Sequence, residues 1–292
     1  MKTILKNLVL YTLIFGFSEL FASPQLPDYI IYKKDTIATY NLILEQYLQK
    51  QDTTAKEKLF GLTFRAGASF NCWRGYQAIY KIQNDSLFLT EILNCGDLRN
   101  GRVDKSGSQK KMKAIFGKNL INEKVYVDWF IGDISFPLQN KVLRDDGVFY
   151  RIFEQEKVIS IKNGIVDTIK DVENYVDDPK SINRRDKNKI ANTLFQKLKK
   201  AKWKNSNKFD CSAKYIITID ENGNISKVRM VNSDEETAQQ YEVKELDFCI
   251  KNIYESLKPL KFDIIKDKGK PIAEDIYLEI WVEDNGKIEN WT

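Results

Sequence analysis

Carboxylates are the only groups in this chain whose spacing suggests acid–base chemistry. The 292 residues include no His, which excludes Ser-His and Cys-His nucleophilic systems and most zinc sites. Two adjacent acidic pairs remain, Asp145 with Asp146 and Asp177 with Asp178. Both lie beside turn residues, where Asp is favoured because its side chain accepts hydrogen bonds from the backbone. We therefore interpret the pairs as turn residues and keep a carboxylate-dependent hydrolase as an alternative.

A stretch that begins like a calcium loop fails at its last ligand. Asp220 opens "DENGN", and the twelfth position from it is Val231, where a calcium loop needs a bidentate Glu. The chain also lacks a Gly-rich phosphate loop, a nucleophile elbow and a Cys-x-x-Cys pair. The sequence therefore predicts no catalytic residue, no metal site and no cofactor, and we expect a non-enzymatic protein.

The most distinctive cluster in the first half of the chain is "NCWRGY". Trp73, Arg74 and Tyr76 form a candidate surface cluster, suited to cation–π contacts or to a carbohydrate. The alternative is that these residues begin a core strand, with Gly75 allowing another backbone to approach closely. We favour the core strand.

The four cysteines divide evenly between the two halves of the chain. Cys72 and Cys95 flank a predicted hairpin, and folding it brings them nearly opposite each other, so we predict a disulfide there. Cys211 opens a second hairpin, and Cys249 lies on the apolar face of a later predicted helix. For this second pair a disulfide and two buried free thiols both remain open.

The first 23 residues have the order of a secretory signal peptide. Lys2 and Lys6 precede an apolar run at 8–17, and the small residues Ala22 and Ser23 follow. The run is too short for the roughly 20 residues of a membrane span, so we expect cleavage, with an uncleaved anchor as the alternative. We therefore expect an exported protein, periplasmic or secreted, in which disulfides can form.

Composition and charge fit an ordinary globular protein with two domains. The hydrophobic fraction is 42% and the formal net charge is +5. This excess is too small and too dispersed for a nucleic-acid-binding protein, so we expect no nucleic acid as partner. The oligomeric state is left open.

The first predicted domain, residues 24–178, is strand-rich. After a short helix within 39–50 come candidate strands at 59–66 and 124–136, and hairpins that turn at Asn84 and Asp85 and at Asn163 and Gly164. The polar segment 97–113 reads as a long exposed loop with one helical turn at its end. We expect an antiparallel sheet or an open barrel of unknown role.

A basic helical connector is predicted at 179–205. Pro179 breaks the preceding structure, Ser181 or Asn183 can cap a helix, and apolar residues then recur at helical spacing. The apolar residues are Ile190, Leu194, Phe195 and Leu198, and the exposed basic face carries Lys197, Lys199, Lys200, Lys202 and Lys204. A membrane could be contacted only through this basic face. We favour the other interpretation, a solvated face on a helix that packs on its own domain.

The last predicted domain, residues 206–292, has the order strand, strand, helix, strand. The hairpin at 215–233 has Asn222 and Gly223 in its turn, and we expect both to take positive φ angles. The helix is ended by Pro259, and "IYLEIWV" forms the final strand. Its apolar stripe consists of Leu246, Cys249, Ile250, Ile253 and Leu257. Together the two domains predict the α+β class.

These motifs carry a family resemblance. "IDENGN" ends the first strand, "VRMVNS" the second, the helix opens near Leu246 and Asp247, and a "KGKP" turn precedes the final strand. In that order and spacing, the segment at about 205–285 resembles the C-terminal domain of TonB and its relatives. Unlike TonB, this chain has six Pro and no proline-rich segment across the periplasm.

The resemblance implies a cell-envelope module that binds a protein or extended peptide through an open sheet edge. This mode is β-augmentation, in which backbone hydrogen bonds supply affinity. The candidate edge is the final strand, with Ile276, Leu278, Ile280 and Val282 on one face and Tyr277, Glu279 and Trp281 on the other. A membrane-tethered energy transducer for outer-membrane transport is the alternative that the resemblance leaves open.

Overall fold

The computed structural model describes residues 25–51, 69–201, 203, 208–232, 241–283, 285 and 287–289. The predicted signal peptide, the strand expected at 59–66, and Lys202 and Lys204 lie outside these residues. The described chain mixes helices and strands and belongs to the α+β class, as predicted.

The described residues form two compact units. Unit 1 comprises the chain up to Phe136 together with Arg144–Arg151 and Val158–Ile169. Unit 2 comprises Pro137–Leu143, Ile152–Lys157 and the chain from Lys170 onward. The chain therefore passes between the units several times, and the domain limits expected at residues 178 and 205 remain predictions.

The largest sheet has the strand order β2-β1-β3-β4-β10-β9-β6, with β5 paired to β4. Its strands are β1 (Asp28–Tyr32), β2 (Asp35–Thr39), β3 (Tyr76–Gln83), β4 (Ser86–Asn94), β5 (Val125–Tyr126), β6 (Gly132–Pro137), β9 (Gln155–Lys162) and β10 (Ile165–Glu173). β1 runs parallel to β3, whereas β3 and β4 form an antiparallel hairpin. A shorter pair joins β7 (Val142–Asp145) and β8 (Arg151–Phe153).

Two hairpin turns in this sheet fold as predicted. Asn84 and Asp85 have φ angles of 50° and 52° between β3 and β4, and Asn163 and Gly164 have 48° and 78° between β9 and β10. Asn, Asp and Gly tolerate positive φ better than other residues, and such angles match the twist of the paired strands.

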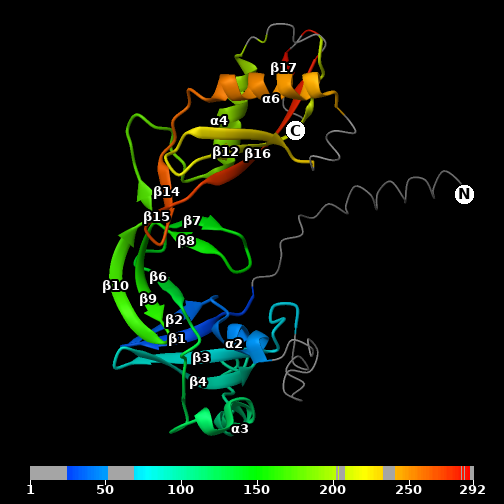
Figure 1. Cartoon of the computed structure of the whole chain (residues 1–292). Coiled ribbons are helices and arrows are strands. Elements are labelled where there is room, and N and C mark those ends of the chain that lie inside the picture. Colours follow the sequence, from blue (N-terminus) through cyan, green and yellow to red (C-terminus); the bar gives the residue numbers. More distant parts are fainter. Residues whose placement is uncertain are drawn as a thin grey trace, which may run out of the picture. The chain divides into compact units, whose positions relative to one another are not determined.

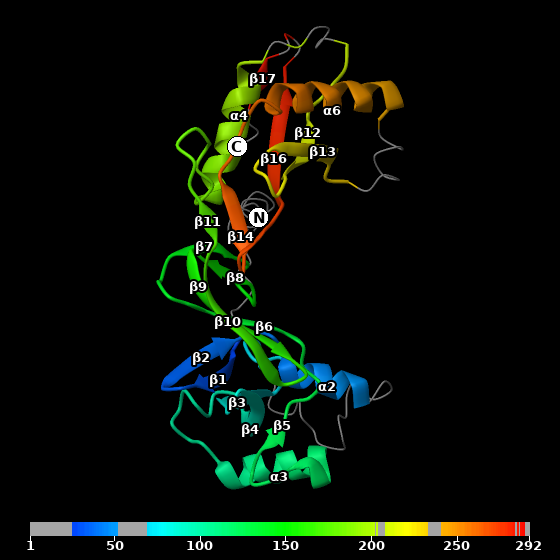
Figure 2. The same ribbon diagram turned by 60° about the vertical axis from the view of Figure 1, so that its left-hand side comes forward.

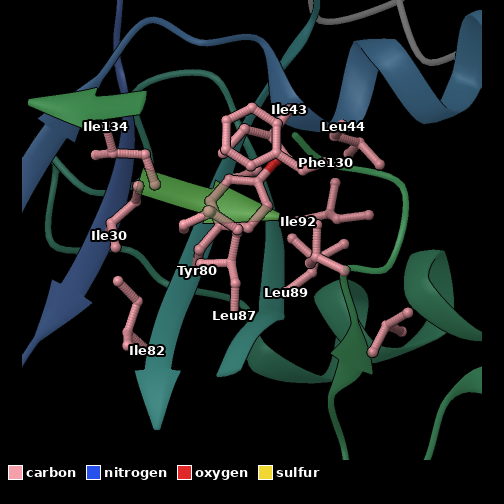
Figure 3. Close-up of a cluster of buried hydrophobic side chains, with 14 of the residues drawn as sticks. Ile30, Ile43, Leu44, Tyr80, Ile82, Leu87, Leu89, Ile92, Phe130 and Ile134 are labelled. Carbon is pink, nitrogen blue, oxygen red and sulfur yellow. The ribbon is translucent and has the colours of Figure 1, made fainter. Parts of the chain in front are cut away.

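The core of unit 1 lies between this sheet and two helices. The helices are α2 (Ile43–Gln51), which confirms the helix expected within 39–50, and α3 (Lys105–Phe116), which runs into the short 3₁₀ helix η3 (Gly117–Asn119). Figure 3 shows the core side chains, with Ile43 and Leu44 of α2 against Tyr80 of β3 and Leu89 of β4. All four are fully buried, so burial of apolar surface fixes α2 on the sheet.

The prediction of a long exposed loop at 97–113 is wrong, because α3 begins at Lys105 and occupies most of the second half of that segment. The Asp104 side chain caps the helix by accepting a hydrogen bond from the Gly107 backbone N–H at 2.9 Å. Met112, Ile115 and Phe116 then bury the apolar side of the helix in the core of unit 1. Tertiary packing thus outweighs the polar, glycine-bearing composition of the segment.

Unit 2 is built on a four-stranded sheet in the order β13-β12-β16-β17. Its strands are β12 (Ala213–Ile219), β13 (Ile225–Met230), β16 (Glu274–Val282) and β17 (Ile288–Glu289). The helices α4 (Lys187–Lys199) and α6 (Val243–Leu257) pack together on one face of this sheet (Figures 1 and 2). A small sheet adds β11 (Tyr175–Val176), β14 (Ile264–Asp267) and β15 (Lys270–Pro271).

Helix α4, which the sequence places in a connector, contributes its whole apolar stripe to the core of unit 2. The residues concerned are Ile190, Leu194, Phe195 and Leu198. The helix begins at Asp186, whose side chain accepts from the Asn188 backbone N–H at 3.1 Å, and not at the predicted caps Ser181 or Asn183. The described basic residues lie on its outer side.

The β12–β13 turn differs in one respect from its prediction. Gly223 has a φ angle of 80°, but Asn222 does not take a positive φ. The Gly223 N–H bonds the Asp220 carbonyl at 3.0 Å, and the Asp220 N–H bonds the Asn224 carbonyl at 2.8 Å. The loop is thus one residue longer than a two-residue turn, and only its last residue needs the left-handed region.

Both cysteine pairs are disulfides. Cys72 and Cys95 have Cα atoms 6.1 Å apart, and Cys211 and Cys249 have Cα atoms 5.4 Å apart. The predicted first bridge is confirmed, and the second pair resolves to a bridge and not to free thiols. Two disulfides are compatible with an exported protein.

Among the described residues, the structure contains no helix with the length and apolarity to cross a bilayer.

Candidate functional site

Strand β16 is covered along one edge and largely uncovered along the other. On one side, residues 274–280 of β16 pair with all seven residues of β12. On the other side, β17 pairs only with Trp281 and Val282. Within the described chain, β16 is therefore an open edge strand from Glu274 to Ile280.

The register shows which backbone groups face this open edge. The Val282 N–H bonds the Ser212 hydroxyl at 2.9 Å on the β12 side, whereas Trp281 is paired with Glu289 on the β17 side. Because successive residues of a strand direct their N–H and C=O groups to opposite edges, the odd-numbered residues face outward. The outward backbone groups are those of Asp275, Tyr277 and Glu279, and no described strand pairs with them.

The two faces of β16 differ sharply in burial. Ile276, Leu278 and Ile280 are at most 4% exposed and belong to the core of unit 2. Tyr277 and Trp281 are 48% and 42% exposed on the opposite face. The inner row therefore holds the strand rigidly, while the outer row is accessible to a partner.

The neighbours of the outer row come from β12 and β13. Ile216 of β12 lies opposite Tyr277, and Lys214 lies opposite Glu279 with its Nζ 4.0 Å from the carboxylate. Arg229 of β13 reaches across to Asp275 at 3.1 Å. Sequence reasoning had placed the outer row on one face but had missed these partners, because the cross-strand register is not visible in one strand alone.

A buried ion pair fixes the start of β16. Arg184 is fully buried and contacts Glu274 at 3.4 Å through two guanidinium nitrogens, while its Nη1 donates to the Asp263 carbonyl at 3.3 Å. Its backbone N–H donates to the Tyr175 hydroxyl at 2.7 Å, and that hydroxyl donates to the Asp263 carboxylate. Burial and the bond to Asp263 raise the pKa of Tyr175, so it remains a donor.

Trp73, Arg74 and Tyr76 do not form a surface cluster, because Arg74 and Tyr76 are buried, which agrees with the core-strand interpretation. Arg74 is 3% exposed and pairs with buried Asp28 at 2.7 Å. Tyr76 is 1% exposed and donates to Glu45 of α2 at 2.9 Å. A cluster that is to bind a ligand at the surface needs accessible side chains, but Arg74 and Tyr76 lie in the buried interior of unit 1 and only Trp73 is partly exposed.

Of the two acidic pairs, Asp145 ends β7 and Asp177 directly follows β11, while Asp146 and Asp178 accept hydrogen bonds from the turns that come next. The Asp146 carboxylate accepts hydrogen bonds from the backbone N–H groups of Val148, Phe149 and Tyr150. Burial opposes ionisation there, but these donors outweigh it and lower the pKa of Asp146. Asp178 likewise accepts from the Lys180 N–H and the Ser181 hydroxyl. Turn hydrogen bonds thus engage Asp146 and Asp178, whereas Asp145 and Asp177 form ion pairs with Arg151 and Arg185. The hydrolase alternative gains no support from these contacts.

The basic side of α4 offers charge but no apolar surface for a membrane. Lys199 pairs with Glu289 at 3.0 Å, Lys187 with Glu274 at 3.7 Å and Lys189 with Asp186 at 3.6 Å. Because the apolar stripe of α4 is buried in unit 2, the helix cannot insert it between lipids. The packing of α4 on its own unit agrees with the favoured interpretation, and contact of its basic face with a membrane stays a prediction.

No known family, curated protein or solved structure matches this chain.

Proposed function

We propose that this protein is a non-enzymatic protein of the cell envelope that binds an extended peptide or protein segment along the open edge of β16. The observation that carries the proposal is the outward direction of the Asp275, Tyr277 and Glu279 backbone groups, which lack a strand partner in the described chain. Antiparallel pairing of these three residues offers up to six hydrogen bonds, at about 1 kcal/mol each.

The resemblance to the TonB C-terminal domain supports the same binding mode. The elements β12, β13, α6 and β16 follow one another in the order that the resemblance implies, and α6 packs on one face of the sheet. The disulfides favour an exported setting.

A change at Glu279 separates backbone pairing from side-chain contact. Proline at this position removes an outward N–H and leaves the ladder to β12 intact, since proline is tolerated at the free side of an edge strand. The matched control is Glu279→Ala, which removes the side chain but keeps the N–H. Thermal unfolding of both variants checks that unit 2 remains folded.

The readout is photocrosslinking in the exported full chain, with p-benzoylphenylalanine in place of Tyr277. We expect a specific partner to be crosslinked in the Ala background and to be lost in the Pro background. The reference position is Tyr150, which is 40% exposed in unit 1. An unchanged crosslink in the Pro background, or the same crosslink from position 150, contradicts edge binding.

A further inference from the structure

The outer row of β16 has the pattern acidic, aromatic, acidic. Asp275 and Glu279 flank Tyr277 at alternate positions, with side chains that are 50% and 22% exposed, respectively. These are the same three residues whose backbone groups face the open edge. A partner strand paired there would place its own side chains directly beside two carboxylates and a phenol.

The cations that neutralise these carboxylates all come from one side. Arg229 approaches Asp275 from β13, and Lys214 approaches Glu279 from β12, at 3.1 Å and 4.0 Å. The Tyr277 hydroxyl adds a bond to Glu279 at 3.2 Å. On the side of the open edge, no described basic residue forms an ion pair with either carboxylate. A carboxylate accepts several hydrogen bonds, so both retain capacity toward a partner.

The same pattern disfavours pairing between two copies of the chain. If two β16 edges met antiparallel with Tyr277 opposite Tyr277, Asp275 of each copy would lie opposite Glu279 of the other. Like charges directly opposite each other destabilise a strand pair. In this register the two acidic residues would therefore oppose self-association, which an uncharged edge would invite.

We propose that the partner of this edge is an extended peptide with basic residues two positions before and two positions after an apolar or aromatic residue. In that register the basic residues lie beside Asp275 and Glu279, and the central residue packs on Tyr277. This inference rests on the proposed function, since it specifies the ligand of the same edge. Two favourable cross-strand charge pairs correspond to about a 2- to 30-fold gain in affinity.

The test measures three peptides by fluorescence anisotropy against the full chain from residue 24, at low salt. One peptide has lysines two residues either side of a tyrosine, the second has glutamates there, and the third keeps the lysines around a serine. We expect the first to bind most tightly and its advantage to fall as salt screens the charges. Amide hydrogen exchange at Tyr277 and Glu279 reports whether a peptide occupies the edge.

Two charge variants provide the matched comparison. The double variant D275K/E279K is expected to prefer the glutamate peptide, whereas E221K/E255K, with the same change in net charge away from the edge, keeps the original preference. The neutral variant D275N/E279Q keeps the shapes of both side chains and should abolish the preference without unfolding unit 2.

The outcomes separate the inference from the function on which it rests. Protection of the edge amides by all peptides without a charge preference, or with a preference for glutamates, overturns the inference and leaves edge binding intact. Absence of protection with every peptide overturns both. Protection without peptide, together with dimers in sedimentation, shows that a second copy occupies the edge and also overturns the inference.

Discussion

The two units use one disulfide each, but the bridges hold different kinds of contact. In unit 1, Cys72–Cys95 joins the open end of the β3–β4 hairpin, whose strands already pair from Tyr76 to Asn94. In unit 2, Cys211–Cys249 joins the residues before β12 to helix α6. The first bridge therefore reinforces a pairing that the turn has already set, whereas the second fixes a helix on a sheet.

The comparison explains how unit 2 can leave an edge strand open. The covalent link and the shared core hold α6 against the buried face, so the sheet does not depend on a further strand beside β16. Unit 1 instead surrounds its hairpin with β1, β10 and β5. An open edge is thus compatible with stability where the opposite face is well anchored.

The largest expected effect is loss of the disulfides. In the chain-entropy account, replacing Cys211 and Cys249 by Ser destabilises unit 2 by about 4 kcal/mol. Replacing Cys72 and Cys95 by Ser destabilises unit 1 by about 3 kcal/mol, because the loop that Cys72–Cys95 closes is the shorter of the two. Amide hydrogen exchange should rise throughout α6 in the variant without Cys211–Cys249, and mainly near the ends of the β3–β4 hairpin in the variant without Cys72–Cys95. Equal exchange in α6 with and without its bridge would contradict the contrast.

The next largest losses of stability are expected when a buried arginine is replaced. Arg74→Met leaves Asp28 buried without its cation and should cost about 3 kcal/mol in unit 1. Arg184→Met should cost about 2 kcal/mol in unit 2, because its contacts to Glu274 are longer and Lys187 also reaches that carboxylate. Denaturant unfolding, monitored by amide hydrogen exchange in each unit, measures the two losses of stability. A larger loss for Arg184 would reverse the expected order.

Replacing two glycines that have positive φ angles separates backbone strain from steric overlap in the turns. Gly223→Ala should cost about 2 kcal/mol in unit 2, because a Cβ there would overlap the Phe262 carbonyl oxygen in addition to the strained backbone. Gly101→Ala in unit 1 is the matched control, since its φ is 64° but its Cβ would meet no atom within 4 Å. It should cost about 1 kcal/mol. Thermal unfolding distinguishes the two, and equal losses would exclude the steric contribution.

The smallest effect is a dependence on acid pH in both units. Backbone donors outweigh burial and lower the pKa of Asp146 in unit 1 and of Asp220 in unit 2. The folded protein therefore binds fewer protons than the unfolded chain, so the stabilisation is complete above pH ~4 and is lost as pH falls through the lowered pKa values. Asp146→Asn and Asp220→Asn should each make the loss of stability with falling pH slightly less steep. A steeper loss would mean that the pKa of the replaced carboxyl is raised in the folded protein and not lowered.

Local patterns in the sequence predicted much of this fold. The turns at Asn84–Asp85 and Asn163–Gly164, helices α2, α4 and α6, and the pairing of Cys72 with Cys95 all follow from short-range rules of turn chemistry and periodicity. The alternation within Ile276–Val282 likewise indicated which face of β16 is buried.

Features that depend on distant partners were not predicted. Helix α3 forms because Met112, Ile115 and Phe116 meet a core that its polar sequence does not suggest. Arg74 is buried because Asp28, far away in the chain, neutralises it. The two-residue strand β17 carries too little pattern to be recognised, although it determines how much of the edge is open. The partners of Tyr277 required the cross-strand register.

Strand β17 also gives the edge a direction. It occupies the position beside Trp281 and Val282, so a chain that pairs along Asp275, Tyr277 and Glu279 meets it at one end. Under the proposed binding mode, a bound segment must terminate or bend away at this end of the edge. The protein would then select segments near a chain terminus or next to a sharp bend over the middle of a long straight strand.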